Sequence, residues 1–204
     1  YGYVGAVLGA RFGEYAAGYR FGLLGLNLVD KKGLDRGKIR LYTNVGRFVV
    51  PWARHLREAR PLFRRALEGT AAWRPLDYYM MWVYCSLLTH DFASGEPLAK
   101  VQHEAEEGRR RLTKRDAAGA VLDLMTGQRG LVRTLRGLTP VFGSFDDEEV
   151  DEDRLAEHLE RDPDLARPAC WYWIRKLQAY VYSRELDLAT AVAAKAQRLL
   201  WTAS

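Results

Sequence analysis

Hydrophobic positions along the chain recur at spacings of three and four, which is the period of an amphipathic helix. Alanine, leucine, arginine and glutamate dominate, whereas the valine-rich alternation that is typical of strands is scarce. Glycines and prolines interrupt this pattern at Gly33, Pro75, 95–97, 137–143 and 162–163. The sequence therefore predicts an all-α chain. The expected helices span residues 2–11, 14–31, 36–50, 52–69, 76–92, 97–113, 115–136, 151–161, 165–183 and 186–201.

Prolines and aromatic residues refine this prediction. Pro61 falls inside the helix expected at 52–69, so we expect a kink or an end there. Pro97 follows a serine and a glycine and marks a helix start. The longest connection is an irregular insertion at 137–150, whose aromatic residues we expect to pack. Nearly every helix is followed at once by a partner of similar length, which predicts a series of helical hairpins.

A frame of small and large residues recurs along the chain. It reads A-R-P-L-F-R-R-A from Ala59, and related frames begin at Gly18 and Ala189. Gly18 and Ala59 lie 41 residues apart, Lys100 lies 41 further on, and Ala189 follows after 89, about two more periods. Self-similarity at a fixed period of this size is typical of a solenoid of stacked units. The small residues would let each second helix approach its neighbours closely.

Four helix pairs also carry the residues of a known repeat pattern, W-x2-L-G-x2-Y in the first helix and A-x3-F-x2-A in the second. These residues resemble the tetratricopeptide repeat. The resemblance implies one domain over 1–204, a right-handed superhelix of about five antiparallel hairpins. The chain departs from the family in its period of about 41 rather than about 34 residues, in the missing closing proline, and at Lys100 and Glu107. The matching positions are Gly13, Glu14, Tyr15, Gly18, Gly25, Tyr42, Val45, Gly46, Ala59, Phe63, Ala66, Trp82, Cys85, Ser86, Thr89, Gly95, Glu96, Trp173, Lys176, Leu177, Tyr180, Ala189, Ala193 and Ala196.

Four segments, 51–57, 87–102, 133–145 and 169–179, are similar to a helical-repeat region of large bacterial signalling proteins. Those proteins combine a serine/threonine-kinase-like domain, a STAND-type ATPase, helical repeats, a GAF domain and a sensor histidine kinase. The resemblance implies a cytoplasmic interaction and sensing module that regulates a linked ATPase or kinase, within a longer chain. ATP and Mg²⁺ are then expected only in linked domains. This chain carries no phosphate loop and no kinase motif, so we expect no cofactor and no catalytic residue in it.

Composition sets limits on the class of protein. Hydrophobic residues make up 48% and charged residues 28% of the 204 residues, which is typical of a folded globular chain. No run of about 18 apolar residues is present, so we expect no membrane partner. Cys85 and Cys170 stand among apolar residues, which favours two buried free thiols over a disulfide or a reactive thiol.

The formal net charge of +5 is unevenly distributed. Residues 146–162 contain ten acids and two bases, a net charge of −8, which leaves +13 on the remainder. This asymmetry indicates either an internal contact or a charged surface for a partner.

The acidic cluster 146–153 raises one alternative function, a small all-α enzyme that binds Mg²⁺. Such enzymes need a second facing acidic cluster, so an acidic loop and helix N-terminus is the favoured interpretation. The four histidines, His55, His90, His103 and His158, lack the spacing of a metal site, and we expect none.

The arginine runs raise a second alternative, a nucleic-acid-binding repeat protein. The runs are residues 54–65 and 109–115, and glutamates stand close to both in the sequence. A solvated face paired with these glutamates is favoured over nucleic-acid binding.

First helices line the concave surface of a tetratricopeptide array, and the resemblance implies a protein-binding groove there. Trp171, Tyr172 and Trp173 cannot all face one core, so one ring must point to solvent or to a groove. An aromatic residue beside arginines suits an acidic protein or peptide segment, including a neighbouring domain of the same chain. Packing of the same residues on neighbouring repeats remains the alternative. The predicted groove residues are Arg40, Thr43, Arg47, Met80, Leu87, His90, Trp171 and Gln178.

Overall fold

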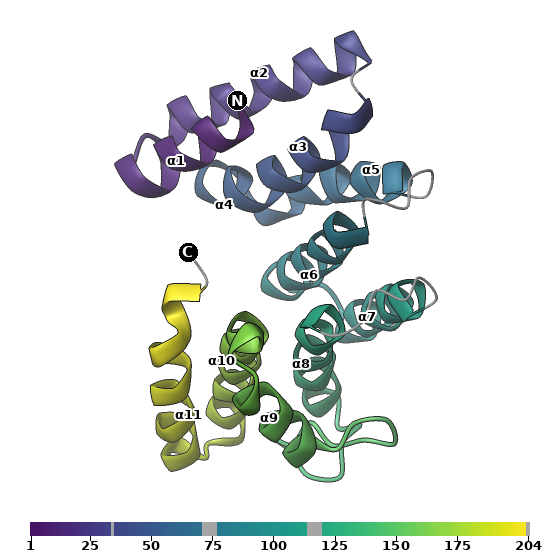
Figure 1. Ribbon diagram of the computed structural model, residues 1–204, viewed down its shortest axis with the longest axis vertical. Helices are drawn as coiled ribbons and strands as arrows, with labels where there is room; N and C mark the ends of the chain where they lie inside the picture. Colours follow the sequence, from purple (N-terminus) through teal and green to yellow (C-terminus); the bar gives the residue numbers. More distant parts are fainter. Residues whose placement is uncertain (34, 71–76, 114–119, 203–204) are drawn as a thin grey trace. The chain divides into compact units, whose positions relative to one another are not determined.

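The computed structural model describes residues 1–33, 35–70, 77–113 and 120–202 (Figure 1). Within these ranges the chain forms helices and no strand, so the all-α prediction is confirmed. The fold divides into two compact units, Tyr1–Glu96 and Pro97–Ser204, and each is described by itself. The single repeat domain over 1–204 stays a prediction.

The first unit is built from paired helices. Helix α1 packs against α2, and α3 contacts both of them; α5 packs against α3 and α6. The helix predicted at 52–69 is interrupted, because the backbone is extended at Arg54 and His55. Pro61 therefore lies in the first turn of a helix rather than at the predicted kink or end. The elements are α1 (Gly2–Phe12), α2 (Tyr15–Lys32), α3 (Asp35–Phe48), α4 (Val50–Ala53), the 3-10 turn η1 (Leu56–Ala59), α5 (Arg60–Thr70) and α6 (Asp77–Ala93).

Small residues bring these helices into close contact, as the recurring frame predicts. A methyl group added at Gly18 would lie 2.5 Å from the carbonyl oxygen of Gly5 on the facing helix. In the second frame Ala59, Phe63 and Ala66 are all fully buried. At Gly18 the facing helix is therefore too close for a larger side chain, and Ala59 and Ala66 lie in the packed interior.

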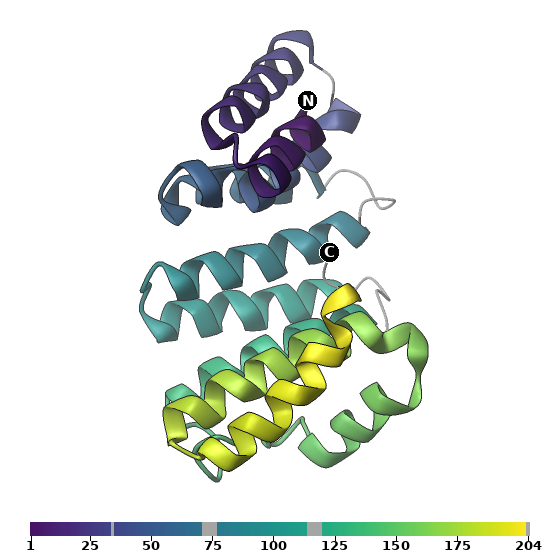
Figure 2. The same cartoon turned by 90° about the vertical axis from the view of Figure 1, so that its left-hand side faces the viewer.

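The second unit places α8 against both α7 and α10, and α11 lies along α10 (Figure 2). The connection from α8 to α9, residues 136–151, contains no helix and includes the predicted insertion 137–150. Phe145 in this connection is fully buried, as expected, whereas Val141 and Phe142 are exposed. The elements are α7 (Leu98–Thr113), α8 (Ala120–Leu135), α9 (Glu152–Arg161), the 3-10 turn η3 (Pro163–Leu165), α10 (Ala166–Ser183), α11 (Leu186–Leu199) and the 3-10 turn η4 (Leu200–Thr202).

Two predictions from composition can be compared with this fold. Cys85 and Cys170 are both buried and free, as predicted. Burial raises the pKa of the Cys170 thiol. None of the helices in the described ranges has the length and apolar character needed to cross a membrane.

Candidate functional site

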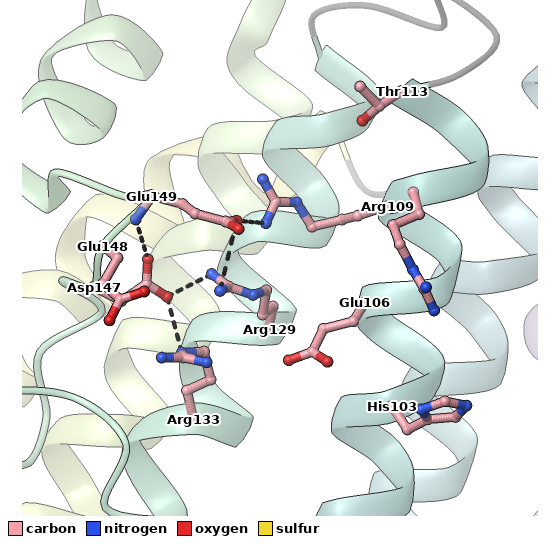
Figure 3. A pocket seen from close by; sticks show the side chains of 10 residues that line it. His103, Glu106, Arg109, Thr113, Arg129, Arg133, Asp147, Glu148 and Glu149 are labelled. Carbon is pink, nitrogen blue, oxygen red and sulfur yellow. Dashed lines mark hydrogen bonds and ion pairs between the residues drawn. The ribbon is translucent and has the colours of Figure 1, made fainter.

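A pocket of about 960 Å³ opens beside α7 and α8 in the second unit (Figure 3). One face of α7 supplies side chains at helical spacing, and α8 supplies two arginines one turn apart. The remaining wall is the tip of the connection from α8 to α9, which we call the acidic tip (residues 147–149). The lining residues are His103, Glu106, Arg109, Arg110, Thr113, Arg129, Arg133, Asp147, Glu148 and Glu149.

Asp147 is the centre of this arrangement, and its side chain is only 3% exposed. Its Oδ2 atom lies 2.5 Å from Nη1 of Arg129 and 2.8 Å from Nε of Arg133. Its Oδ1 atom accepts hydrogen bonds from the backbone N–H groups of Glu149 and Val150, at 2.9 and 3.0 Å. Both carboxylate oxygens are therefore bonded, and the buried negative charge is matched by two guanidinium groups.

Glu149 makes the second contact between the acidic tip and the helices. Its carboxylate lies 2.5 Å from Nη1 of Arg109 and 3.6 Å from Nη2 of Arg129. The hydrogen bond from Arg109 lowers the pKa of Glu149 below its usual range. In contrast to Asp147, this side chain is 58% exposed, so water screens its ion pairs.

The arginines keep unused hydrogen-bonding capacity. The Nε atoms of Arg109 and Arg129 are buried and have no hydrogen-bond partner among the residues that the structure describes. Guanidinium carries five donors in a rigid fork, and the ion pairs of Arg109 and Arg129 leave these Nε–H groups unsatisfied.

The base of the connection is fixed on α10 by a separate network around Glu152. The ammonium group of Lys176 forms an ion pair with Glu152 and donates to the carbonyl oxygen of Gly143 at 2.7 Å. The Tyr172 hydroxyl donates to the same carboxylate at 3.0 Å, and the backbone N–H of Phe145 donates to it at 2.7 Å. Burial, with a smaller contribution from Glu152, raises the pKa of Tyr172 far above its ordinary value. This network contains neither Asp147 nor Glu149.

Two glycines on α8 lie where this helix contacts the connection and α10. A methyl group at Gly130 would lie 2.5 Å from the Phe145 ring, and one at Gly127 would lie 3.5 Å from the backbone of Tyr172. Gly130 therefore makes space for the Phe145 ring, whereas a methyl group at Gly127 would make an ordinary van der Waals contact. Between these glycines and just beyond them, Arg129 and Arg133 point into the pocket.

Sequence reasoning anticipated the acidic cluster and the basic run that meet here, and internal contact was one of its two interpretations. It missed Arg129 and Arg133. The available signal was the presence of two arginines four residues apart on a helix that is otherwise largely apolar.

The predicted groove residues on α3 lie in three different environments. Arg40 is exposed, donates to the Tyr3 hydroxyl at 3.1 Å and thereby lowers the pKa of that tyrosine. Thr43 is buried and donates to the carbonyl oxygen of Ile39. The Arg47 guanidinium lies over the Trp82 ring, 4.0 Å from its centre.

Three predicted groove residues on α6 belong to the core. Met80 and Leu87 are 3% and 0% exposed. His90 is 8% exposed and meets the Phe63 ring edge-on, and burial lowers its pKa. These three side chains and Thr43 offer no surface to a ligand, so the predicted groove is corrected at these four positions. Their helical spacing on the first helix of a pair predicts a concave binding face, whereas in the structure these four side chains fill the interior.

The last two predicted groove residues, Trp171 and Gln178, lie on α10 in the other unit. Both are partly exposed. Arg175 links them, because its guanidinium lies 5.6 Å from the centre of the Trp171 ring and donates to Gln178 at 2.8 Å. The structure thus brings these two residues together, while the other six lie in the first unit.

Several other acids and bases have local partners. Arg110 and Arg111 pair with Glu107 on α7, the helix-face pairing that the sequence favoured. Asp146 accepts a hydrogen bond from the Glu152 N–H, and Asp151 caps α9. In the described part of the chain, no group of three or more histidine, cysteine, aspartate or glutamate side chains is arranged to hold a metal ion.

A smaller pocket of about 420 Å³ lies in the first unit, beside α2 and α4. The rings of Tyr15 and Trp52 stack there with their centres 5.7 Å apart, and Arg54 lies over the Tyr19 ring. A hydrogen bond with Tyr19 raises the pKa of Arg54. Fewer charged side chains line this pocket than line the larger pocket beside α7 and α8, which we call the arginine pocket.

Comparisons of the chain with family models, with curated proteins and with solved structures give no match.

Proposed function

We propose that the chain is a protein-interaction and signal-sensing module whose arginine pocket binds an acidic segment of another protein or of a neighbouring domain. The observation that carries this proposal is the acidic tip itself. Two carboxylates, those of Asp147 and Glu149, are held by three arginines from two helices. The pocket is thus already complementary to a peptide that bears closely spaced acids.

The chemistry of the pocket favours an acidic peptide over a small neutral ligand. Arginine binds carboxylates through a planar fork of donors, and such pairs strengthen as they are shielded from water. Charged side chains line both helices, so recognition would depend mainly on charge.

The wider role also forms part of the proposal. Consecutive helix pairs and closely packed small residues support a tetratricopeptide-like superhelix of about five hairpins. In such an array each unit touches only its neighbours, so binding at one place can alter how the array meets a linked domain. We propose a cytoplasmic regulator of a linked ATPase or kinase in a bacterial signalling protein, with ATP and Mg²⁺ bound by the linked domains.

No observation favours the alternative of a Mg²⁺-dependent enzyme. The carboxylates of Asp146, Asp147 and Asp151 accept hydrogen bonds from arginines or backbone N–H groups, and the described residues contain no group of three or more such side chains arranged to hold a metal ion. Nucleic-acid binding is also not favoured, because Arg110 and Arg111 already pair with Glu107.

Titration with two peptides tests the interaction directly. The first peptide is rich in aspartate and glutamate, and the second replaces each acid with its amide. We expect the arginine side-chain NMR signals of Arg109 and Arg129 to shift with the acidic peptide only, and Arg109→Gln to weaken binding. Absence of any shift at millimolar peptide, or equal binding of both peptides, would refute this function.

Sequencing the source locus across both ends of the chain tests the wider role. A phosphate-loop ATPase on one side and a histidine-kinase core on the other are the expected result. Neighbouring reading frames of unrelated type, with start and stop codons at the two ends, would remove the linked-enzyme part of the proposal.

A further inference from the structure

We infer that the acidic tip is a displaceable internal ligand, and that the true ligand is an acidic turn with two carboxylates at the Asp-x-Glu spacing. This inference rests on the proposed function and specifies both its ligand and its regulation. The chain's own segment Asp147–Glu149 shows which shape the arginines accept. A partner segment of the same chemistry would compete with it for the same guanidinium groups.

The acidic tip is a compact turn with its own hydrogen bonds. The backbone N–H of Asp147 donates to the carbonyl oxygen of Val150 at 3.0 Å, and Oδ1 of Asp147 accepts from the N–H groups of Glu149 and Val150. This leaves Oδ2 of Asp147 and the carboxylate of Glu149 directed at the arginines (Figure 3). A ligand that forms the same turn would present two acids in the same way.

The tip can leave without opening its base. Asp146 accepts from the N–H of Glu152 at 2.7 Å, and Glu152 in turn accepts from the N–H of Phe145 at 2.7 Å. Phe145 is 1% exposed, and Lys176 holds Glu152 on α10. Because these contacts close the loop on both sides of residues 147–151, release of the tip frees only a few residues.

The pocket gains a net positive charge when the acidic tip leaves. With the tip in place, four arginines face four carboxylates around the cavity. Without Asp147, Glu148 and Glu149, the lining keeps four arginines and one carboxylate, that of Glu106, while Arg110 stays paired with Glu107 on the same helix. An acidic segment of a partner is therefore attracted strongly to the open pocket and weakly to the closed one. The partner segment and the acidic tip compete for the same arginines.

Competition of this kind has a defined arithmetic. The apparent dissociation constant equals the intrinsic one divided by the fraction of open pocket, so any change that weakens the closed state tightens binding by the same factor. Loss of the exposed Glu149 contact should raise affinity roughly two- to fivefold, and loss of the buried Asp147 contact about tenfold or more.

The experiment measures fluorescence anisotropy of a labelled octapeptide, S-F-D-D-E-E-V-D, which copies residues 144–151. The whole chain is titrated as wild type, Glu149→Gln and Asp147→Asn. Glu157→Gln is the matched control, since Glu157 forms an exposed ion pair with Arg161 away from the pocket. We expect tighter binding by about two- to fivefold for Glu149→Gln and about tenfold or more for Asp147→Asn, and no change for the control.

A double variant locates the bound peptide. Arg109→Gln added to Glu149→Gln should remove the gain in affinity, because Arg109 is the donor that Glu149 releases. Equal binding by wild type and Glu149→Gln, still weakened by Arg109→Gln, would overturn the displaceable tip and leave the proposed function intact. Since Glu149 is exposed, its replacement tests the inference even if Asp147→Asn does not fold.

Two further outcomes would overturn the proposed function or the assignment of the ligand as a peptide. If no variant binds the octapeptide, the proposed function fails together with the inference. If a labelled thymidine oligonucleotide binds as tightly as the octapeptide, and with the same dependence on Arg109, the ligand is a phosphate backbone and the peptide assignment is wrong.

Discussion

Replacing Asp147 with asparagine should lower the free energy of unfolding of the second unit by about 3 kcal/mol. The substitution keeps the size of the side chain and an oxygen for the N–H groups of Glu149 and Val150. It removes the charge that balances Arg129 and Arg133, whose side chains are 6% and 19% exposed. Loss of one partner of a buried ion pair costs about 3–5 kcal/mol, because the other charge stays buried. The nearby carboxylate of Glu149 places the expected value at the low end.

Urea unfolding followed by circular dichroism measures this change. With a slope of about 2 kcal/mol per molar urea, 3 kcal/mol lowers the midpoint by about 1.5 M. Glu157→Gln is the control, because both side chains of its ion pair are more than 60% exposed and should contribute less than about 1 kcal/mol. If the two variants unfold at the same urea concentration, the Asp147 contact is not a buried charge pair and the argument for the site is refuted.

Three other substitutions test further contacts. Gly18→Ala should destabilise the first unit by about 1–3 kcal/mol, because the new methyl group would lie 2.5 Å from a backbone carbonyl oxygen. Gly37→Ala is the control, since its methyl group would point into open space and should not destabilise the unit. Equal melting temperatures of the two variants would contradict this prediction. Lys176→Met should cost about 3–5 kcal/mol in urea unfolding, and adding Glu152→Gln should recover part of that loss; a purely additive double variant would argue against their coupling. Burial lowers the pKa of His90, so at low pH the unfolded chain binds a proton that the folded chain does not. The melting temperature should therefore fall as the pH drops below about 6.5. If the melting temperature of His90→Gln falls with pH as steeply as that of the wild type, His90 is not the group responsible.

Much of the fold could be predicted from the sequence because helical periodicity and helix ends are local properties. The predicted helices agree with the observed ones over most of the described chain, and the predicted break at 95–97 coincides with the boundary in the sequence between the two units. The exception is 52–69, where the sequence predicts a kink or an end at Pro61 and the actual interruption lies at Arg54 and His55. Proline fixes its own backbone angle but does not by itself show whether a helix starts or stops there.

The candidate site could be predicted only in part. The charge asymmetry of the chain indicated that residues 146–162 would meet a basic surface or a partner. It did not identify Arg129, which is 18 residues from Asp147, or the pairing of Arg109 with Glu149 across 40 residues. Such pairs depend on how α7, α8 and the connection pack, and no local pattern encodes that distance.

The sequence by itself determined that the chain is helical, where its small residues lie, and that its acids and bases are separated. Only the tertiary structure decided which of those charges meet, and that Thr43, Met80, Leu87 and His90 are interior rather than lining a groove. The physical reason is that secondary structure follows from interactions within a few residues. Burial and ion pairing follow from contacts between segments distant in the chain, which a single sequence leaves open.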